Sequence, residues 1–162
     1  MAGPVATSEP TLNHTHLFTL SLTVDPNMAD VGETPYGRRR IATVTGGSFE
    51  GQEIRGTVLP APGGDWLTQR RDGIVTLDVR LTLKTHDEHL VYMQYRGMRH
   101  GPPWVIEALT KGEKVDPGQY YMRATPWFET ASEKYRFLNR IVCVATGRRE
   151  AAGPVYDVFQ IL

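Results

Sequence analysis

Residues 74–84 read IVTLDVRLTLK, and from Val75 onward their side chains alternate strictly between apolar and polar. The odd positions from 75 to 83 are all Val or Leu, whereas the even positions from 76 to 84 are Thr, Asp, Arg or Lys. A period of two is typical of a strand, because successive side chains point to opposite faces of the backbone. The stretch is therefore predicted to be a strand.

The sequence on either side of this strand predicts more sheet. Asp72-Gly73 favours a tight hairpin turn before it, and residues 90–97 are its expected hairpin partner after it. Gly46-Gly47 is read as a bend. Other strand-like runs cover residues 14–24, 38–45, 52–59, 120–125, 140–146 and 155–162, loops are expected at 26–37 and 60–64, and one or two helical turns at 104–109.

Many short strands without alternating helices predict an all-β fold. We expect a single antiparallel β-barrel of about 8–10 strands with an internal cavity and at most one short helix, because closure removes exposed sheet edges. Residues 1–12 are expected to be a flexible N-terminal segment, and residues 13–162 a single domain.

Composition narrows the functional classes. The chain has 162 residues with 18 basic and 18 acidic side chains, so neither nucleic acid nor a membrane is an expected partner. The N-terminus, MAGPVATSEP, lacks the features of a secretory signal, which favours a cytoplasmic protein. Cys143 is the single cysteine and is expected to be a buried apolar residue.

Asp65 and Trp66 follow a double glycine in an expected loop at the barrel mouth. A carboxyl group that an indole shields from water has a raised pKa, which suits a general acid or base. The alternative is that Asp65 forms a turn and Trp66 plugs one end of the barrel.

Asp78 and Arg80 share one strand face. If this face lines the lumen, Arg80 could hold a substrate carboxylate or enolate with Asp78 positioning it, and we favour this orientation. If it lies outside, the two form an ordinary solvated pair. The next strand would add either Tyr92 or Tyr95 to the pocket.

A third group of candidate site residues lies between positions 121 and 139. Tyr121 and Arg123 share a strand face, and tyrosine hydroxyls need partners when buried. Either a substrate pocket or a structural polar network could result. The candidates here are Glu129 as a further catalytic group, and Tyr121, Arg123, Phe128, Tyr135 and Asn139 as substrate-binding residues.

Other charged motifs are weaker signals. Arg38-Arg39-Arg40 is interpreted as a solvated face, because the middle side chain of three on a strand points away from the others. His86 and His89 have the chemistry of metal ligands but lack a third His or Cys at a recognisable spacing. Nucleotide-binding glycine loops, nucleophile elbows and paired cysteines are missing. No metal and no cofactor are therefore expected.

Several short motifs occur in a characteristic order, among them Gly46-Gly-x-Phe-x-Gly, Gly64-Asp-Trp, Asp78-Val-Arg80 and Tyr135-x-x-Leu-Asn139. Together they resemble the family catalogued as "domain of unknown function 3237" over residues 14–162. The resemblance implies a closed barrel with a cavity, often oligomeric, with some relatives in natural-product pathways where cofactor-free ring formation or isomerisation is proposed. This chain departs from the family at His86–His89, where an Asp-Gly hairpin is usual.

These observations favour a cofactor-independent lyase, cyclase or isomerase acting on a small apolar or aromatic molecule that carries a carbonyl or hydroxyl group. The alternative is a non-catalytic small-ligand-binding barrel, either a carrier or a sensor, and a scaffold for oligomers is a weaker third. A homodimer or larger homo-oligomer is expected, because an inward Arg80 would leave the Val and Leu row of residues 75–83 outside, where it must be covered.

Overall fold

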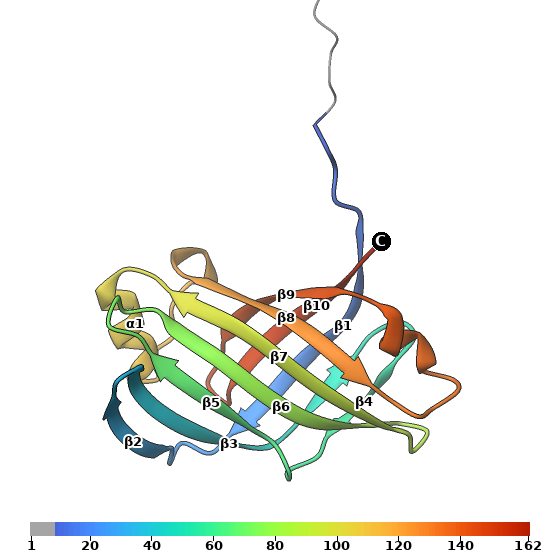
Figure 1. The fold of residues 1–162 in the computed structure, drawn as a ribbon, viewed down its shortest axis with the longest axis horizontal. Coiled ribbons are helices and arrows are strands. Elements are labelled where there is room, and N and C mark those ends of the chain that lie inside the picture. Colours follow the sequence, from blue (N-terminus) through green and yellow to red (C-terminus); the bar gives the residue numbers. More distant parts are fainter. Residues whose placement is uncertain (1–8) are drawn as a thin grey trace, which may run out of the picture.

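The computed structural model describes residues 9–162 as a closed antiparallel β-barrel with one α-helix (Figure 1). Most of the expected flexible segment, residues 1–8, lies outside the described residues. The strands are β1 (His14–Val24), β2 (Ala29–Thr34), β3 (Gly37–Glu50), β4 (Arg55–Val58), β5 (Gly64–Gln69), β6 (Val75–Thr85), β7 (Leu90–His100), β8 (Tyr121–Glu129), β9 (Cys143–Arg149) and β10 (Pro154–Ile161). The helix is α1 (Pro103–Thr110), and two short 3-10 turns are η1 (Pro117–Gln119) and η2 (Arg136–Arg140).

The barrel closes because β3 is long enough to pair with four strands. Its first half pairs with β2 and β5, and its second half with β1 and β4. From β1 the circuit runs through β10, β9, β8, β7 and β6, and β4 and β5 then occupy one position between β6 and β3. The closed circuit therefore has eight positions, and the predicted barrel is confirmed.

The 74–84 strand behaves as its pattern predicts. It forms β6 and pairs with β7 along its whole length, from Val75 opposite Arg99 to Lys84 opposite Leu90. Its Val and Leu row is buried, at most 5% exposed. The row points into the barrel because the interior is the only face from which water is excluded.

Two local expectations about β2 and β3 were wrong, and a third, about β5, is described with the cavity. Residues 26–37, expected to be a loop, contain β2, which extends β3 into a hairpin. Gly46 and Gly47 lie inside β3, where they take positive φ values of 149° and 145° beside a register shift in β1. A Cβ on Gly47 would lie 2.2 Å from the carbonyl oxygen of Ser21, so β1 can approach only a glycine here.

Large aromatic side chains fill one end of the barrel. Phe18 packs against Phe49 and Phe128 with ring centroids 5.4 and 5.8 Å apart, and Leu83 is fully buried. The register places these residues toward the end formed by the β6–β7 turn. The helix α1 covers the opposite end (Figure 1). The α1 end therefore keeps the open space.

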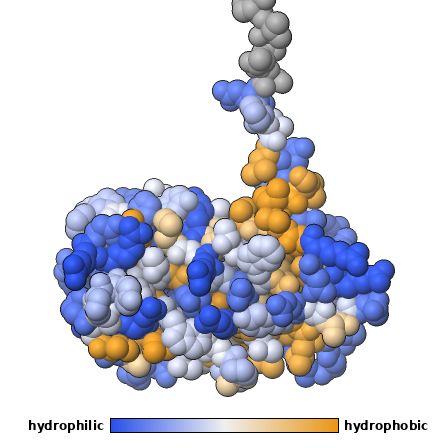
Figure 2. Space-filling model, in the orientation of Figure 1, coloured by the Kyte–Doolittle hydropathy of each residue, from blue (hydrophilic) through white to orange (hydrophobic). Residues whose placement is uncertain are grey.

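The predicted reason for assembly does not hold, because the Val and Leu row of β6 is core rather than surface. Apolar side chains are exposed elsewhere, at Leu12, Val142 and Leu162. Figure 2 shows apolar surface gathered where the chain termini leave the barrel. Homo-oligomerisation stays a prediction that light scattering can measure. Among the described residues, no helix has the length and hydropathy needed to span a bilayer.

Candidate ligand cavity

A cavity of about 310 Å³ occupies the α1 end of the barrel. Most of its wall is apolar, and its rim is formed by the segment after β1, the turn after α1 and the β9–β10 turn. The polar groups inside come from five strands: Arg40 on β3, Asp65 on β5, Tyr95 and Arg99 on β7, Arg149 on β9 and Tyr156 on β10. Its size is at the lower end of the usual range for small-molecule pockets.

Asp65 is the one carboxylate deep in this cavity. It lies on β5 rather than in a loop, and it shares a row with Val79 and Tyr95 across three neighbouring strands. Burial raises its pKa to about 6, although the backbone N–H of Asp78, which donates to Oδ1 at 3.1 Å, and the charge of Arg99 oppose the rise. A carboxyl with this pKa exchanges protons readily near neutral pH.

Two phenols stand beside Asp65. Tyr95 and Tyr156 are each 2% exposed, and their ring centroids are 5.0 Å apart in an edge-to-face arrangement. Burial raises the pKa of both hydroxyls, so both stay protonated at neutral pH and can donate hydrogen bonds. Gly147 makes room for Tyr156, since a Cβ there would lie 2.7 Å from the tyrosine ring.

Three arginines line the same space. Arg99 is 9% exposed, and burial lowers its pKa, as do the neighbouring charges of Arg149 and Arg40. The Nε atoms of Arg40 and Arg99 are buried and find no hydrogen-bond partner among residues 9–162. The deep part of the cavity wall therefore carries three guanidinium groups and one carboxylate, that of Asp65.

The favoured orientation of Asp78 and Arg80 was wrong. Both side chains lie outside the barrel, 34% and 45% exposed, with Arg80 Nη1 3.7 Å from Asp78 Oδ1. Trp66 also faces outward, and the Arg80 guanidinium lies 5.3 Å from the centre of its ring. Trp66 thus shields Arg80 rather than Asp65, because adjacent residues of one strand face opposite sides.

Other predicted site residues also lie on the outer surface. A hollow of about 740 Å³ over β5–β9 is lined by Trp66 and Asp78 together with Tyr121 and Arg123. The Tyr121 ring stacks on His100 with centroids 4.8 Å apart. On the same side of the sheet, Tyr92 donates from its hydroxyl to Gln94 Oε1 at 2.9 Å.

The remaining predicted residues belong to the opposite end of the barrel. Phe128 is core, and Glu129 is exposed at the end of β8. Asn139 holds a loop, accepting from the Thr130 N–H at 2.8 Å and donating to its carbonyl at 2.9 Å. Of the twelve predicted residues, only Asp65 and Tyr95 line the cavity.

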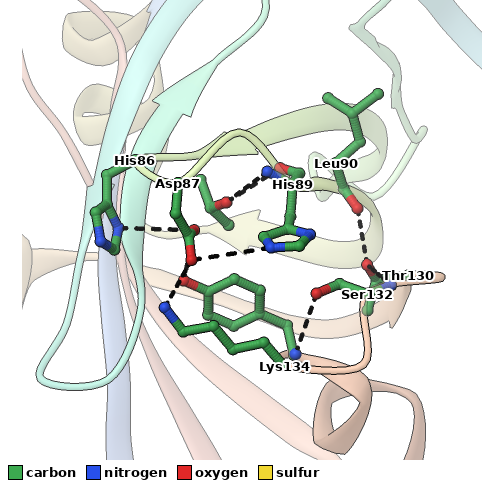
Figure 3. Close-up of polar contacts among 9 residues, drawn as sticks. His86, Asp87, His89, Leu90, Thr130, Ser132 and Lys134 are labelled. Carbon is green, nitrogen blue, oxygen red and sulfur yellow. Dashed lines mark hydrogen bonds and ion pairs between the residues drawn. The ribbon is translucent and has the colours of Figure 1, made fainter.

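A polar network surrounds Asp87 in the β6–β7 turn (Figure 3), and Tyr135 takes part in it. Its hydroxyl donates to Asp87 Oδ1 at 2.8 Å, and Lys134 Nζ contacts Oδ2 at 2.6 Å. His86 and His89 face the same carboxylate at 4.0 and 3.9 Å. The network pins the turn where the chain lacks the Asp-Gly hairpin. Within residues 9–162 no three His, Cys, Asp or Glu side chains are placed to hold a metal.

Four cavity residues were not predicted as site residues: Arg40, Arg99, Arg149 and Tyr156. The interpretation of Arg40 as part of a solvated face was wrong, because its side chain lines the cavity. A signal for all four exists, because each is in phase with the buried positions of its own strand. Arg40 is in phase with the buried Ala42 and Val44, for example. Extending the period of two to the strand ends would have placed these polar side chains inside.

Comparison with known proteins agrees with this fold. The chain is 37% identical over 153 residues to the UPF0311 protein of Bradyrhizobium diazoefficiens, covering 94% of this chain and 99% of the relative. A crystal structure of a conserved protein of unknown function from Rhodopseudomonas palustris superposes with a TM-score of 0.90 at 35% identity, covering 94% of this chain and 99% of that one.

Two further structures share the barrel. A β-barrel-like protein from Acinetobacter baumannii gives a TM-score of 0.82 at 34% identity, covering 96% of this chain and 99% of that one. A protein described as an enzyme, from Penicillium herquei, gives 0.71 at 22% identity with the same coverage, which shows the fold alone. Residues 10–161 match the family described as "Protein of unknown function (DUF3237)", and the chain therefore belongs to that family.

Proposed function

We propose that this protein is a cofactor-independent enzyme, a lyase, cyclase or isomerase, that moves a proton on a small molecule held in the barrel cavity. The observation that carries the proposal is the Asp65 carboxyl group, whose pKa burial raises to about 6, facing the cavity beside two buried phenols. Acid–base groups are most effective when their pKa lies near the working pH.

The chemistry needs only groups of this chain. The Asp65 carboxylate takes a proton from a carbon next to a substrate carbonyl, and the electron pair of the C–H bond moves to the carbonyl oxygen as an enolate. The Tyr95 and Tyr156 hydroxyls can donate to that oxygen, and the arginine charges favour it. Asp65, now protonated, returns the proton to the same or another carbon. A protein from Penicillium herquei with the same fold is described as an enzyme, which is compatible with the proposal.

The alternative is a carrier or sensor that binds its ligand without reaction. The mostly apolar wall and the two protonated phenols favour it, because they supply affinity and hydrogen bonds without proton transfer. The two functions differ in whether Asp65 exchanges protons with the ligand.

Hydrogen–deuterium exchange on the ligand distinguishes the enzyme from the carrier or sensor. Small aryl ketones, 1,3-dicarbonyl compounds and unsaturated acids are incubated with the protein in D2O, and NMR follows loss of C–H signal. We expect the wild type to accelerate exchange or isomerisation for at least one compound, and Asp65→Asn to be slower by about 10²-fold or more. Glu129→Gln, a change of an exposed carboxylate at the opposite end of the barrel, is the matched control and should keep the rate. Full activity in Asp65→Asn would remove Asp65 from the mechanism, and binding without exchange would favour the carrier.

A further inference from the structure

The charges inside the cavity do not balance. Arg40, Arg99 and Arg149 line its wall, and Asp65 is the single carboxylate among them. At the rim, Lys111 pairs with Glu107 at 2.8 Å, and Asp25 Oδ1 accepts the Asn27 N–H at 2.8 Å, so both are engaged locally. The deep part of the cavity therefore keeps an excess of positive charge.

The cost of this arrangement points to a ligand. Arg99 is 9% exposed, and its buried Nε donates to no group of residues 9–162; the same is true of Arg40 Nε. Buried guanidinium groups are costly unless they are paired and hydrogen-bonded. Stable folds retain such groups where an anion completes the pairing, and guanidinium geometry matches a carboxylate through two parallel hydrogen bonds.

The rest of the wall defines the body of the ligand. Side chains such as Leu67, Leu77 and Met122 surround the polar groups, and the volume of about 310 Å³ limits the ligand to a small molecule. We propose that the cavity binds a small organic anion, an apolar or aromatic body carrying one carboxylate or enolate that Arg40, Arg99 and Arg149 receive. This inference names the ligand class of the proposed function and relies on it only for the place of binding.

The arrangement assigns separate tasks to the charged groups. The arginines hold the anionic end, and Asp65 faces the part of the ligand that reacts. Removing an arginine should therefore weaken the binding of anions selectively, whereas removing the Asp65 charge should leave anion binding intact or strengthen it, because one negative charge leaves the cavity.

Benzoate and its neutral counterpart benzamide make a matched pair of probes. Calorimetric titration at neutral pH and low salt should show benzoate binding at least about tenfold more tightly than benzamide, the difference expected from a charge-assisted bidentate pair. Arg99→Met should lower the affinity for benzoate by at least about tenfold and leave the affinity for benzamide unchanged. Arg80→Met, an arginine change on the outer face, should leave both unchanged. Inorganic phosphate should compete weakly, because it lacks the apolar body.

Several results would overturn the proposal. The proposal fails if benzoate does not bind, or if it binds no more tightly than benzamide or phosphate. It also fails if Arg99→Met and Arg80→Met lose the same amount of benzoate affinity. If Arg99→Met does not fold, Arg149→Met carries the same expectation. Asp65→Asn distinguishes the two proposals, because it should slow deuterium exchange by about 10²-fold or more while benzoate still binds. Exchange without anion preference would defeat this inference alone, and anion preference without exchange would defeat the proposed enzyme alone.

Discussion

Replacing Asp65 by Asn should stabilise the protein at neutral pH, and the gain should disappear in acid. Burial raises the pKa of Asp65 from 3.8 to about 6 in the folded state. Between these two values the folded protein binds more protons than the unfolded chain, so the free energy of unfolding falls as the pH rises through this window. The difference is about two pKa units at about 1.4 kcal/mol each, which gives about 3 kcal/mol as an upper limit at pH above 7.

Urea denaturation of wild type and Asp65→Asn across this pH range measures the effect. The variant should gain up to about 3 kcal/mol over wild type between acid and neutral pH, because a neutral amide has no charge to desolvate. Any packing cost of the amide is independent of pH and cancels in the comparison. A constant difference between the two proteins at all pH values would refute the reasoning.

Asp87→Asn should change the pH dependence of stability in the opposite direction, so it serves as a control. The contact with Lys134, assisted by the Tyr135 hydroxyl, holds the pKa of Asp87 well below its usual range. Its stabilising effect is present at neutral pH and is lost as the pH falls. The variant should therefore be less stable than wild type at neutral pH and approach it in acid. A variant of unchanged stability at neutral pH would mean that the network of Figure 3 contributes little.

Three further experiments test the packing of the core. Gly147→Ala should destabilise the protein by about 1–3 kcal/mol in urea, because the new methyl group would overlap Tyr156; an unchanged midpoint would mean that the ring moves freely. Leu83→Ala, at a fully buried position, should cost about 2–5 kcal/mol, and a smaller loss would indicate that the core relaxes around the gap. Burial raises the pKa of Cys143 to about 11, so a thiol reagent at pH 8 should modify the native protein far more slowly than the urea-unfolded chain, and equal rates would place this thiol at the surface.

Local sequence determined the elements of the fold. The period of two over residues 74–84 defined β6 and its apolar face, and the polar segment after it predicted the hairpin with β7, which the structure confirms. The expected short helix at 104–109 corresponds to α1. Strands and turns depend on contacts between close neighbours in the chain, which a pattern of side chains records directly.

Tertiary structure decided between the two orientations that chemistry left open for β6. Asp78 and Arg80 suited a binding site by chemistry, but closure of the barrel turned the opposite, apolar face of β6 to the interior and left them in solvent. Asp65 reached the cavity and its neighbour Trp66 did not, because adjacent strand residues face opposite sides.

The composition of the cavity was also decided by closure. Arg40, Arg99 and the hairpin pair Arg149 and Tyr156 come from three distant parts of the chain, and each looks in isolation like an ordinary polar residue near a strand end. They meet only when β1 pairs with β3 and completes the barrel. Local patterns state which residues share a face of one strand, whereas the grouping of side chains from distant strands depends on register around the whole circuit.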